Sequence, residues 1–299
     1  MGNLFPTMDL VFYWSAPLLD VNRPEMREQI RALSPEFCQS FDGIAPVGPP
    51  IERIVSLPSD PDYAAAIATI QNCGGIPVHA RRFVIDTVLL SPGTQTPDDY
   101  YDPAFYRNRL LQLNVERDSM GLAANFWDTE RYEANEFTPQ FDFLDRTLST
   151  SFERFTGAIQ EALYTVSPAT YVTSYGDRVP LKPVWPMGKL GATQLCQTAF
   201  TVRNVAELET RINRPPGWMH DIRGWTVYID INEDAPRSIA GRPAWTIPEF
   251  LNTFHALVPQ IQAVYPECRT CMVFMERSEM ARGVRRWTEL IRAGYGRAS

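Results

Sequence analysis

Arg82-Phe-Val-Ile-Asp-Thr-Val-Leu-Leu90 is an apolar, β-branched run with the length of a buried strand. Asp102-Pro103 then opens a helical stretch, in which Leu110, Leu111 and Val115 recur at helical spacing. A second apolar run follows, Gly121-Leu-Ala-Ala-Asn-Phe-Trp127. This succession of strand, helix and strand predicts a parallel α/β unit.

The same alternation continues in both directions along the chain. Further strands are predicted at Leu10–Trp14, Gly43–Val47, Tyr171–Ser174, Thr193–Phe200, Trp225–Ile229 and Thr270–Met275. Helices are predicted at about Pro24–Leu33, Asp60–Ile70, Phe143–Val166, Val205–Ile212, Ile247–Val264 and Ala281–Ala293. Eight strands separated mostly by helices predict a (β/α)8 TIM barrel that is irregular around its fifth and sixth strands.

The length of 299 residues, 44% of them hydrophobic, suits such a barrel as one domain over residues 1–299. No linker or break in composition divides the chain. An open doubly wound sheet is the competing fold. It is disfavoured because no strand is followed by a GxGxxG or GxxxxGK[ST] turn.

Charge and composition exclude several kinds of partner. A net charge of −7 argues against binding nucleic acid, which needs a basic surface. No apolar stretch is long enough for insertion into a membrane, and the N-terminus lacks the pattern of a signal peptide. Five cysteines, an odd number, fit a reducing compartment. We therefore expect a protein that is cytoplasmic or part of a particle.

Some kinds of chemistry are also disfavoured. The only lysines are Lys182 and Lys189, and neither ends a convincing strand, so a Schiff-base mechanism is not expected. Cys268-Arg-Thr-Cys271 leads into an apolar run and is expected to pack rather than bind zinc. No HxH or HExxH pattern occurs, so the sequence predicts no metal and no cofactor.

The working residues of a barrel lie at the C-terminal ends of its strands. The predicted strand ends are rich in carboxylates and aromatic rings, which can bind and cleave sugars. The candidate catalytic residues are Asp128, Glu130, Asp230 and Glu276. The candidate substrate-binding residues are Trp14, Asp86, Tyr132 and Tyr175.

Asp128 and Glu130 are the strongest pair. They are two residues apart, so they point to the same face if the strand continues. Two close carboxyl groups raise the pKa of one, which lets one donate a proton while the other stays ionised. The alternative is that the pair caps the next helix or binds arginines such as Arg131.

The segment Met120-Gly-Leu-Ala-Ala-Asn-Phe-Trp-Asp-Thr-Glu-Arg-Tyr132 resembles the D-x-E-x-Y strand of uncharacterised bacterial glycoside-hydrolase-like barrel proteins. Two upstream features fit that family's order, namely Phe41-Asp42-Gly43 and Arg82-Phe83, together with an asparagine on the preceding helix at 108 or 114. The likeness covers about residues 38–175. It implies a (β/α)8 barrel and a sugar-related substrate, with Asp128, Glu130 and Tyr132 as site positions.

Chitinase-type barrels also place D-x-E at this strand end, with further aspartates upstream. The corresponding positions are Ala123 and Phe126, which argues against a chitinase mechanism.

Three functions stay open at this stage. The leading one is a glycoside hydrolase in which Glu130 is the general acid/base and Asp230 or Glu276 is the opposing carboxylate. The rival is a catalytically silent barrel that binds carbohydrate or forms part of an assembly such as a viral or surface particle. The third is a metal-dependent lyase or isomerase using Asp86, Asp128, Glu130 and Asp230.

Overall fold

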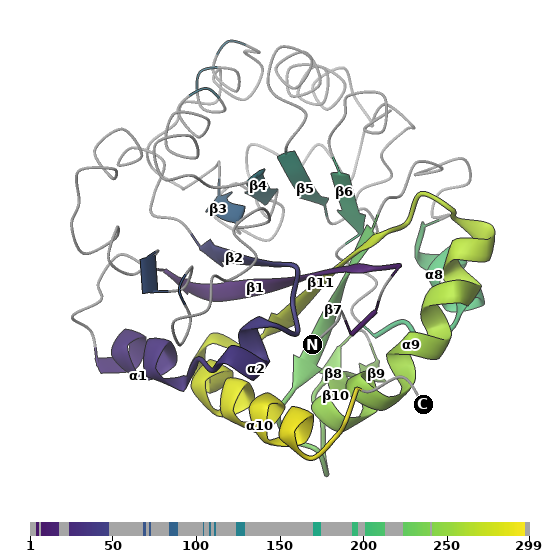
Figure 1. Cartoon of the computed structure of the whole chain (residues 1–299). Coiled ribbons are helices and arrows are strands. Elements are labelled where there is room, and N and C mark those ends of the chain that lie inside the picture. The colour runs from purple at the N-terminus through teal and green to yellow at the C-terminus, as the bar shows by residue number, and fades with distance from the viewer. Residues whose placement is uncertain are drawn as a thin grey trace.

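A parallel sheet with helices on its outer side makes up the described part of the chain (Figure 1). The computed structural model describes residues 4–5, 7–17, 24–47, 68–69, 72, 84–88, 104, 108, 111, 124–128, 170–174, 193–196, 201–212, 224–239 and 241–296.

Eight strands of four or more residues make up most of a nine-stranded parallel sheet, whose ninth strand is the short β10 (Trp245–Thr246). Their bounds are β1 (Asp9–Pro17), β2 (Gly43–Val47), β3 (Val84–Val88), β4 (Ala124–Asp128), β5 (Thr170–Ser174), β6 (Thr193–Cys196), β7 (Gly224–Asp230) and β11 (Thr270–Met275). They pair in the order β7-β11-β1-β2-β3-β4-β5-β6, and β6 also pairs with β7. The predicted parallel α/β sheet is therefore confirmed. The complete (β/α)8 barrel stays a prediction, since most residues between β2 and β6 lie outside the described ones.

Three short strands follow β7. Ser238–Ile239 (β8) and Arg242–Pro243 (β9) form a two-stranded antiparallel sheet. Trp245–Thr246 (β10) then pairs with Ile229 and Asp230, beside the C-terminal end of β7. None of these three strands is predicted from the sequence, because each is too short to show a hydrophobic period.

The described helices longer than one turn are α1 (Pro24–Ala32), α8 (Val205–Ile212), α9 (Ile247–Val264) and α10 (Met280–Arg292). Short turns occur at α2 (Pro35–Cys38) and η9 (Arg277–Glu279). Helix α9 begins with a capping box, in which Thr246 Oγ1 accepts from the Glu249 backbone N–H and Glu249 Oε2 accepts from that of Thr246. The predicted bounds of α8 and α9 are confirmed.

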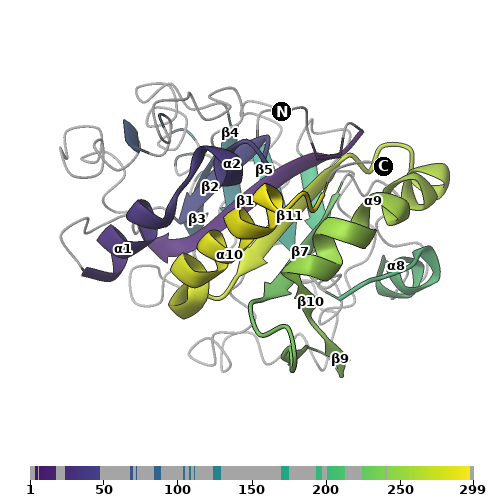
Figure 2. The same cartoon turned by 60° about the horizontal axis from the view of Figure 1, so that its bottom comes forward.

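Helices α9 and α10 lie across β7, β11 and β1, as Figure 2 shows. Aromatic rings fill the space between these layers. Trp225 of β7 packs on Phe254 of α9, with ring centroids 5.6 Å apart. Phe12 of β1 packs on Phe37, and Phe41 packs on Trp287 of α10, each pair at 5.0 Å.

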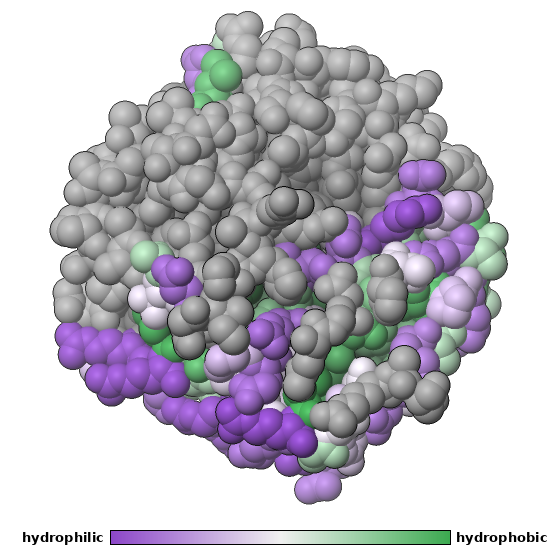
Figure 3. Space-filling view, in the orientation of Figure 1, coloured by the Kyte–Doolittle hydropathy of each residue, from purple (hydrophilic) through white to green (hydrophobic). Residues whose placement is uncertain are grey.

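Arginines on α10 bind acidic residues of α1 and α2 at the surface. Arg292 donates two hydrogen bonds to Glu36, which lower the pKa of that carboxyl group. Arg285 binds Glu28 of α1 at 2.9 Å. In the space-filling view, hydrophilic residues cover much of the described lower rim, with hydrophobic residues visible between them (Figure 3).

The Phe41-Asp42-Gly43 segment has a structural role at the N-terminal end of β2. Asp42 Oδ2 accepts a hydrogen bond from the Leu10 backbone N–H at 2.9 Å, and the Asp42 N–H donates to the Leu10 carbonyl at 2.7 Å. These bonds set the start of the β1–β2 pairing. The segment thus lies at the edge of the sheet opposite to the C-terminal strand ends.

Cys268 and Cys271 are both buried and form no disulfide, which agrees with the packing role expected for this pair. Burial raises the pKa of the Cys271 thiol well above its ordinary value. Cys38 is instead disulfide-bonded, which the cysteine count did not predict.

Among the described helices, none is long and apolar enough to cross a bilayer.

Gly283 of α10 lies close to the side chains of Met275 in β11 and of Ile231. A Cβ atom there would lie 2.7 Å from Met275 Sδ and 3.0 Å from Ile231 Cγ2. We predict that Gly283→Val lowers the free energy of unfolding by about 1–3 kcal/mol, because these two side chains must shift to make room for the added methyl groups. Urea denaturation would measure the change. The matched control, Ala256→Val, adds a branched side chain at an exposed position of α9 and should cost about 0.5 kcal/mol or less. Equal losses in the two variants would contradict the prediction.

Candidate functional site at the C-terminal strand ends

The structure places five of the eight candidate residues at known positions in the sheet. Glu276 follows β11 directly, and the side chains of Asp230 and Glu276 are both described. Trp14, Asp86 and Asp128 are described as backbone positions in β1, β3 and β4. Glu130, Tyr132 and Tyr175 lie outside the described residues.

Asp128 is the last residue of β4 rather than the first residue after it. It pairs with Val88, the last residue of β3, on one side and with Thr173 of β5 on the other. Asp86 pairs with Phe126, in the body of β3, and Trp14 pairs with Pro46 of β2. Since all these strands are parallel, Asp128 shares one edge of the sheet with Asp230 and Glu276.

Asp230 ends β7 and is buried, with 2% of its side chain exposed. Its carboxylate accepts backbone hydrogen bonds from Asn232 at 2.9 Å and from Arg237 at 2.7 Å. Both oxygens are thereby used to fold the loop that follows the strand. A carboxylate held in this way is a loop anchor, and its access to a ligand is small.

Glu276 is more accessible, with 37% of its side chain exposed. Its Oε2 accepts a hydrogen bond from Arg237 Nη1 at 3.3 Å. Arg237 also lies 3.7 Å from Glu279 Oε1 and 3.8 Å from Asp230 Oδ2. One guanidinium thus lies near three carboxylates, so these four side chains together carry a net negative charge.

Tyr228 lies beside this charged group and two residues before Asp230. Its ring is buried and packs on Phe274 at 5.2 Å, and Phe274 packs on Tyr13 at the same distance. The three rings form one row, because Tyr228, Phe274 and Tyr13 are register partners on adjacent strands. Tyr13 and Phe274 are partly exposed. Trp225 contacts Phe254 of α9, and Tyr228 is three residues further along the same strand. Because side chains alternate along a strand, the row lies on the face of the sheet opposite to α9.

Burial raises the pKa of Tyr228 from its ordinary value of 10.0 to about 12. Arg237 acts in the opposite direction, and the carboxylates of Glu276, Asp230 and Glu279 raise the value further. The phenol is therefore neutral at physiological pH and can donate a hydrogen bond. The sequence offered one signal for Tyr228, its spacing of two from Asp230 in a strand. It offered none for Arg237.

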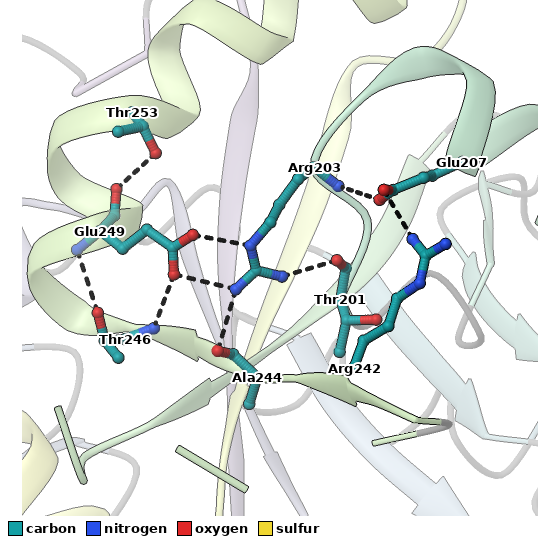
Figure 4. Close-up of polar contacts among 8 residues, drawn as sticks. All are labelled: Thr201, Arg203, Glu207, Arg242, Ala244, Thr246, Glu249 and Thr253. Carbon is teal, nitrogen blue, oxygen red and sulfur yellow. Dashed lines mark hydrogen bonds and ion pairs between the residues drawn. The ribbon is translucent and has the colours of Figure 1, made fainter. Parts of the chain in front are cut away.

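A second network fixes the far end of the same loop (Figure 4). Arg203, which precedes α8, donates to Glu249 at 2.7 Å and 2.9 Å. It also donates to the carbonyls of Thr201 and Ala244, and its guanidinium stacks on Trp245 at 4.4 Å. Arg242 of β9 binds Glu207 of α8 at 2.7 Å. The segment between β7 and α9 is thus held from both sides.

Among the side chains that the structure describes, no three of His, Cys, Asp or Glu come close enough together to hold a metal ion.

Comparisons with known proteins bear on the fold. No protein-family model matches this chain, and no curated protein sequence matches it either. Among solved structures, a GH18 chitinase from Pseudoalteromonas aurantia is similar, with a TM-score of 0.50 and 12% sequence identity over 95% of this chain and 99% of that chain. A chitinase from Bacteroides thetaiotaomicron has a TM-score of 0.49 and 12% identity, over 94% of this chain and 96% of that one. The first likeness shows a similar fold and does not bear on the D-x-E-x-Y segment.

The contacts of Arg203 with Glu249, with two backbone carbonyls and with Trp245 should stabilise the fold. We predict that Arg203→Leu lowers the free energy of unfolding by about 2–3 kcal/mol, because Glu249 loses its two charged donors. Arg203→Lys should fall between this variant and the native chain, since an ammonium group cannot bind both oxygens as a fork. The control is Arg285→Leu, which breaks an exposed pair and should cost less than about 1 kcal/mol. If urea denaturation gave the same loss for the Arg203 and Arg285 variants, the network would not have the importance assigned to it.

Tyr228 should make stability fall at alkaline pH. Its folded pKa of about 12 exceeds the ordinary 10.0, so the unfolded chain ionises first as pH rises between these values. The stability that the fold gains by keeping this phenol protonated is fully present below pH 10 and is lost progressively towards pH 12. Between pH 9 and pH 11, native protein should lose about 1 kcal/mol more stability than Tyr228→Phe. Chemical denaturation at the two pH values measures this, and an equal loss in both proteins would exclude the effect.

Proposed function

We propose that this chain is a glycoside-hydrolase-like (β/α)8 barrel that acts on a carbohydrate by carboxylate acid–base chemistry. The observation that carries the proposal is the shared edge of the sheet. Asp128 ends β4, Asp230 ends β7 and Glu276 follows β11, all at the C-terminal ends of parallel strands. In barrel enzymes this is the end at which catalytic residues gather.

Further support comes from the strand pairings and the fold comparison. The additional pairing of β6 with β7, through Leu195 with Gly224 and Cys196 with Trp225, is the contact that a closed barrel requires. The GH18 chitinase of Pseudoalteromonas aurantia has a similar fold at 12% identity. Fold alone does not fix function, so the argument for catalysis depends on the carboxylates.

We assign the general acid/base role to Glu130, with Asp128 as its neighbour that tunes its protonation. Glu276 is the better choice than Asp230 for the opposing carboxylate. Its side chain is 37% exposed, whereas that of Asp230 is 2% exposed. Each oxygen of Asp230 also accepts a hydrogen bond from a backbone N–H group, which holds this carboxylate to the loop after β7.

The aromatic row gives the site a surface that suits a sugar. Tyr13 and Phe274 are partly exposed beside the buried Tyr228. Aromatic faces bind the apolar faces of sugar rings. The row lies beside the carboxylates of Asp230 and Glu276, at what we propose to be the mouth of the barrel, and this neighbourhood supports a carbohydrate ligand.

Hydrolysis of an oligosaccharide panel tests the assignment. The panel includes chito-, cello- and xylo-oligosaccharides, and new reducing ends are measured. Glu130→Gln and Glu276→Gln should each lower the rate by about 100-fold or more. The control is Asp234→Asn, an exposed residue of the loop after β7, which should keep the native rate.

Asp230→Asn separates the two candidates for the opposing carboxylate. It should lower the melting temperature, because a buried loop anchor is altered, whereas Glu276→Gln should leave melting nearly unchanged. If Glu130→Gln and Glu276→Gln kept the native rate, the mechanism would be wrong. Binding of an oligosaccharide without hydrolysis would favour the catalytically silent barrel.

A further inference from the structure

We propose that Arg237 is a positioning residue that holds the carboxylate of Glu276 at the mouth, and that Asp230 fixes the loop that carries Arg237. The functional part of this inference rests on the role proposed above for Glu276. The structural part, that Glu276 is held in place by Arg237, stands apart from any reaction.

The backbone of Arg237 is fixed on both sides. Its N–H donates to Asp230 Oδ2 at 2.7 Å, and its carbonyl accepts from the Ala244 N–H at 2.7 Å. The first bond ties residue 237 to the end of β7, and the second ties it to the residue before β10. The loop therefore presents the Arg237 side chain from a defined point of the sheet edge.

Each nitrogen of the Arg237 guanidinium lies nearest to a different carboxylate. Nη1 lies 3.3 Å from Glu276, Nη2 lies 3.7 Å from Glu279 and Nε lies 3.8 Å from Asp230. Only the contact with Glu276 is within hydrogen-bond distance. Arg237 is thus shared, but its one directed interaction is with the most exposed of the three acids.

Glu276 and Glu279 lie one turn apart, and the Glu279 N–H donates to the Glu276 carbonyl at 3.0 Å. Their like charges repel each other, and Asp230 adds a third negative charge nearby. Among the described residues, Arg237 is the cation that contacts all three acids. Arg237 therefore opposes the movement of the Glu276 side chain away from Glu279 and Asp230.

A purely stabilising role accounts poorly for this arrangement. Arg237 and Glu276 are 48% and 37% exposed, and exposed ion pairs contribute little to stability. The same edge carries Tyr228, whose charge environment includes Arg237, Glu276, Asp230 and Glu279. The guanidinium therefore sets the position and surroundings of the groups at the mouth.

Crystal structures of native protein, Arg237→Gln and Arg237→Lys test the structural part. In the Gln variant, the Glu276 carboxylate should move by more than about 1 Å, the scale on which misplacement matters for catalysis. The Lys variant should restore much of the native position. The matched control is Arg285→Gln, which breaks an exposed pair on α10 and should leave Glu276 in place. An unmoved Glu276 in the Gln variant would overturn the proposal.

A kinetic cycle with Glu276→Gln tests whether Arg237 acts through Glu276. Arg237→Gln alone should lower kcat by about 100-fold with little change in KM. In the Glu276→Gln background, the same substitution should change kcat by less than about 2-fold, because the group it positions is gone. An equal loss in both backgrounds would overturn the proposal. If native protein cleaves no glycan, the proposed function fails, while the crystal structures still decide whether Arg237 positions Glu276.

Discussion

Aromatic packing between the sheet and two helices is the interaction on which the described structure depends. Trp225 contacts Phe254, and Phe41 contacts Trp287, so β7 is joined to α9 and the start of β2 to α10. Phe250 and Phe254 stack on each other within α9 at 4.4 Å, and Phe5 packs against both. Large rings buried in this way contribute much of the free energy of folding. They also fix the strands with respect to the helices.

The candidate site follows from the other face of the same strands. Residues alternate along a strand, so burying Trp225 against α9 turns Tyr228 to the opposite side. The parallel register then sets Tyr228, Phe274 and Tyr13 beside one another. The carboxylates beyond this row lie at the sheet edge because the strands end there. The geometry of the mouth is therefore a consequence of how the core is packed.

Much of the sheet could be predicted from the sequence because its strands are apolar and long enough to show a period. The bounds of β2, β11 and α9 agree with the predicted ones. Asp128 and Asp230 were expected just after their strands and are instead the last strand residues. Polar residues at a strand end carry no hydrophobic signal, so the end is misplaced by one residue.

The role of the loop after β7 could not be predicted. Asp230 was read as a candidate for catalysis, whereas its two oxygens bind backbone N–H groups of the next residues. The sequence carries no signal for Arg237, because its contacts with Glu276 and Glu279 join segments about 40 residues apart. Contacts of this kind depend on the register of β7 and β11, which sequence spacing does not reveal.

Strand β10 has a consequence for how this protein behaves among its own copies. The described pairing of β6 with β7 covers Gly224 and Trp225, at the beginning of β7, while β10 pairs with Ile229 and Asp230 at its end. The chain thus supplies its own short strand along the end of β7, on the side where β6 pairs with its beginning. An open edge is a template on which another polypeptide can add as a strand. The Arg203 network that holds β10 in place is thereby also a safeguard against aggregation.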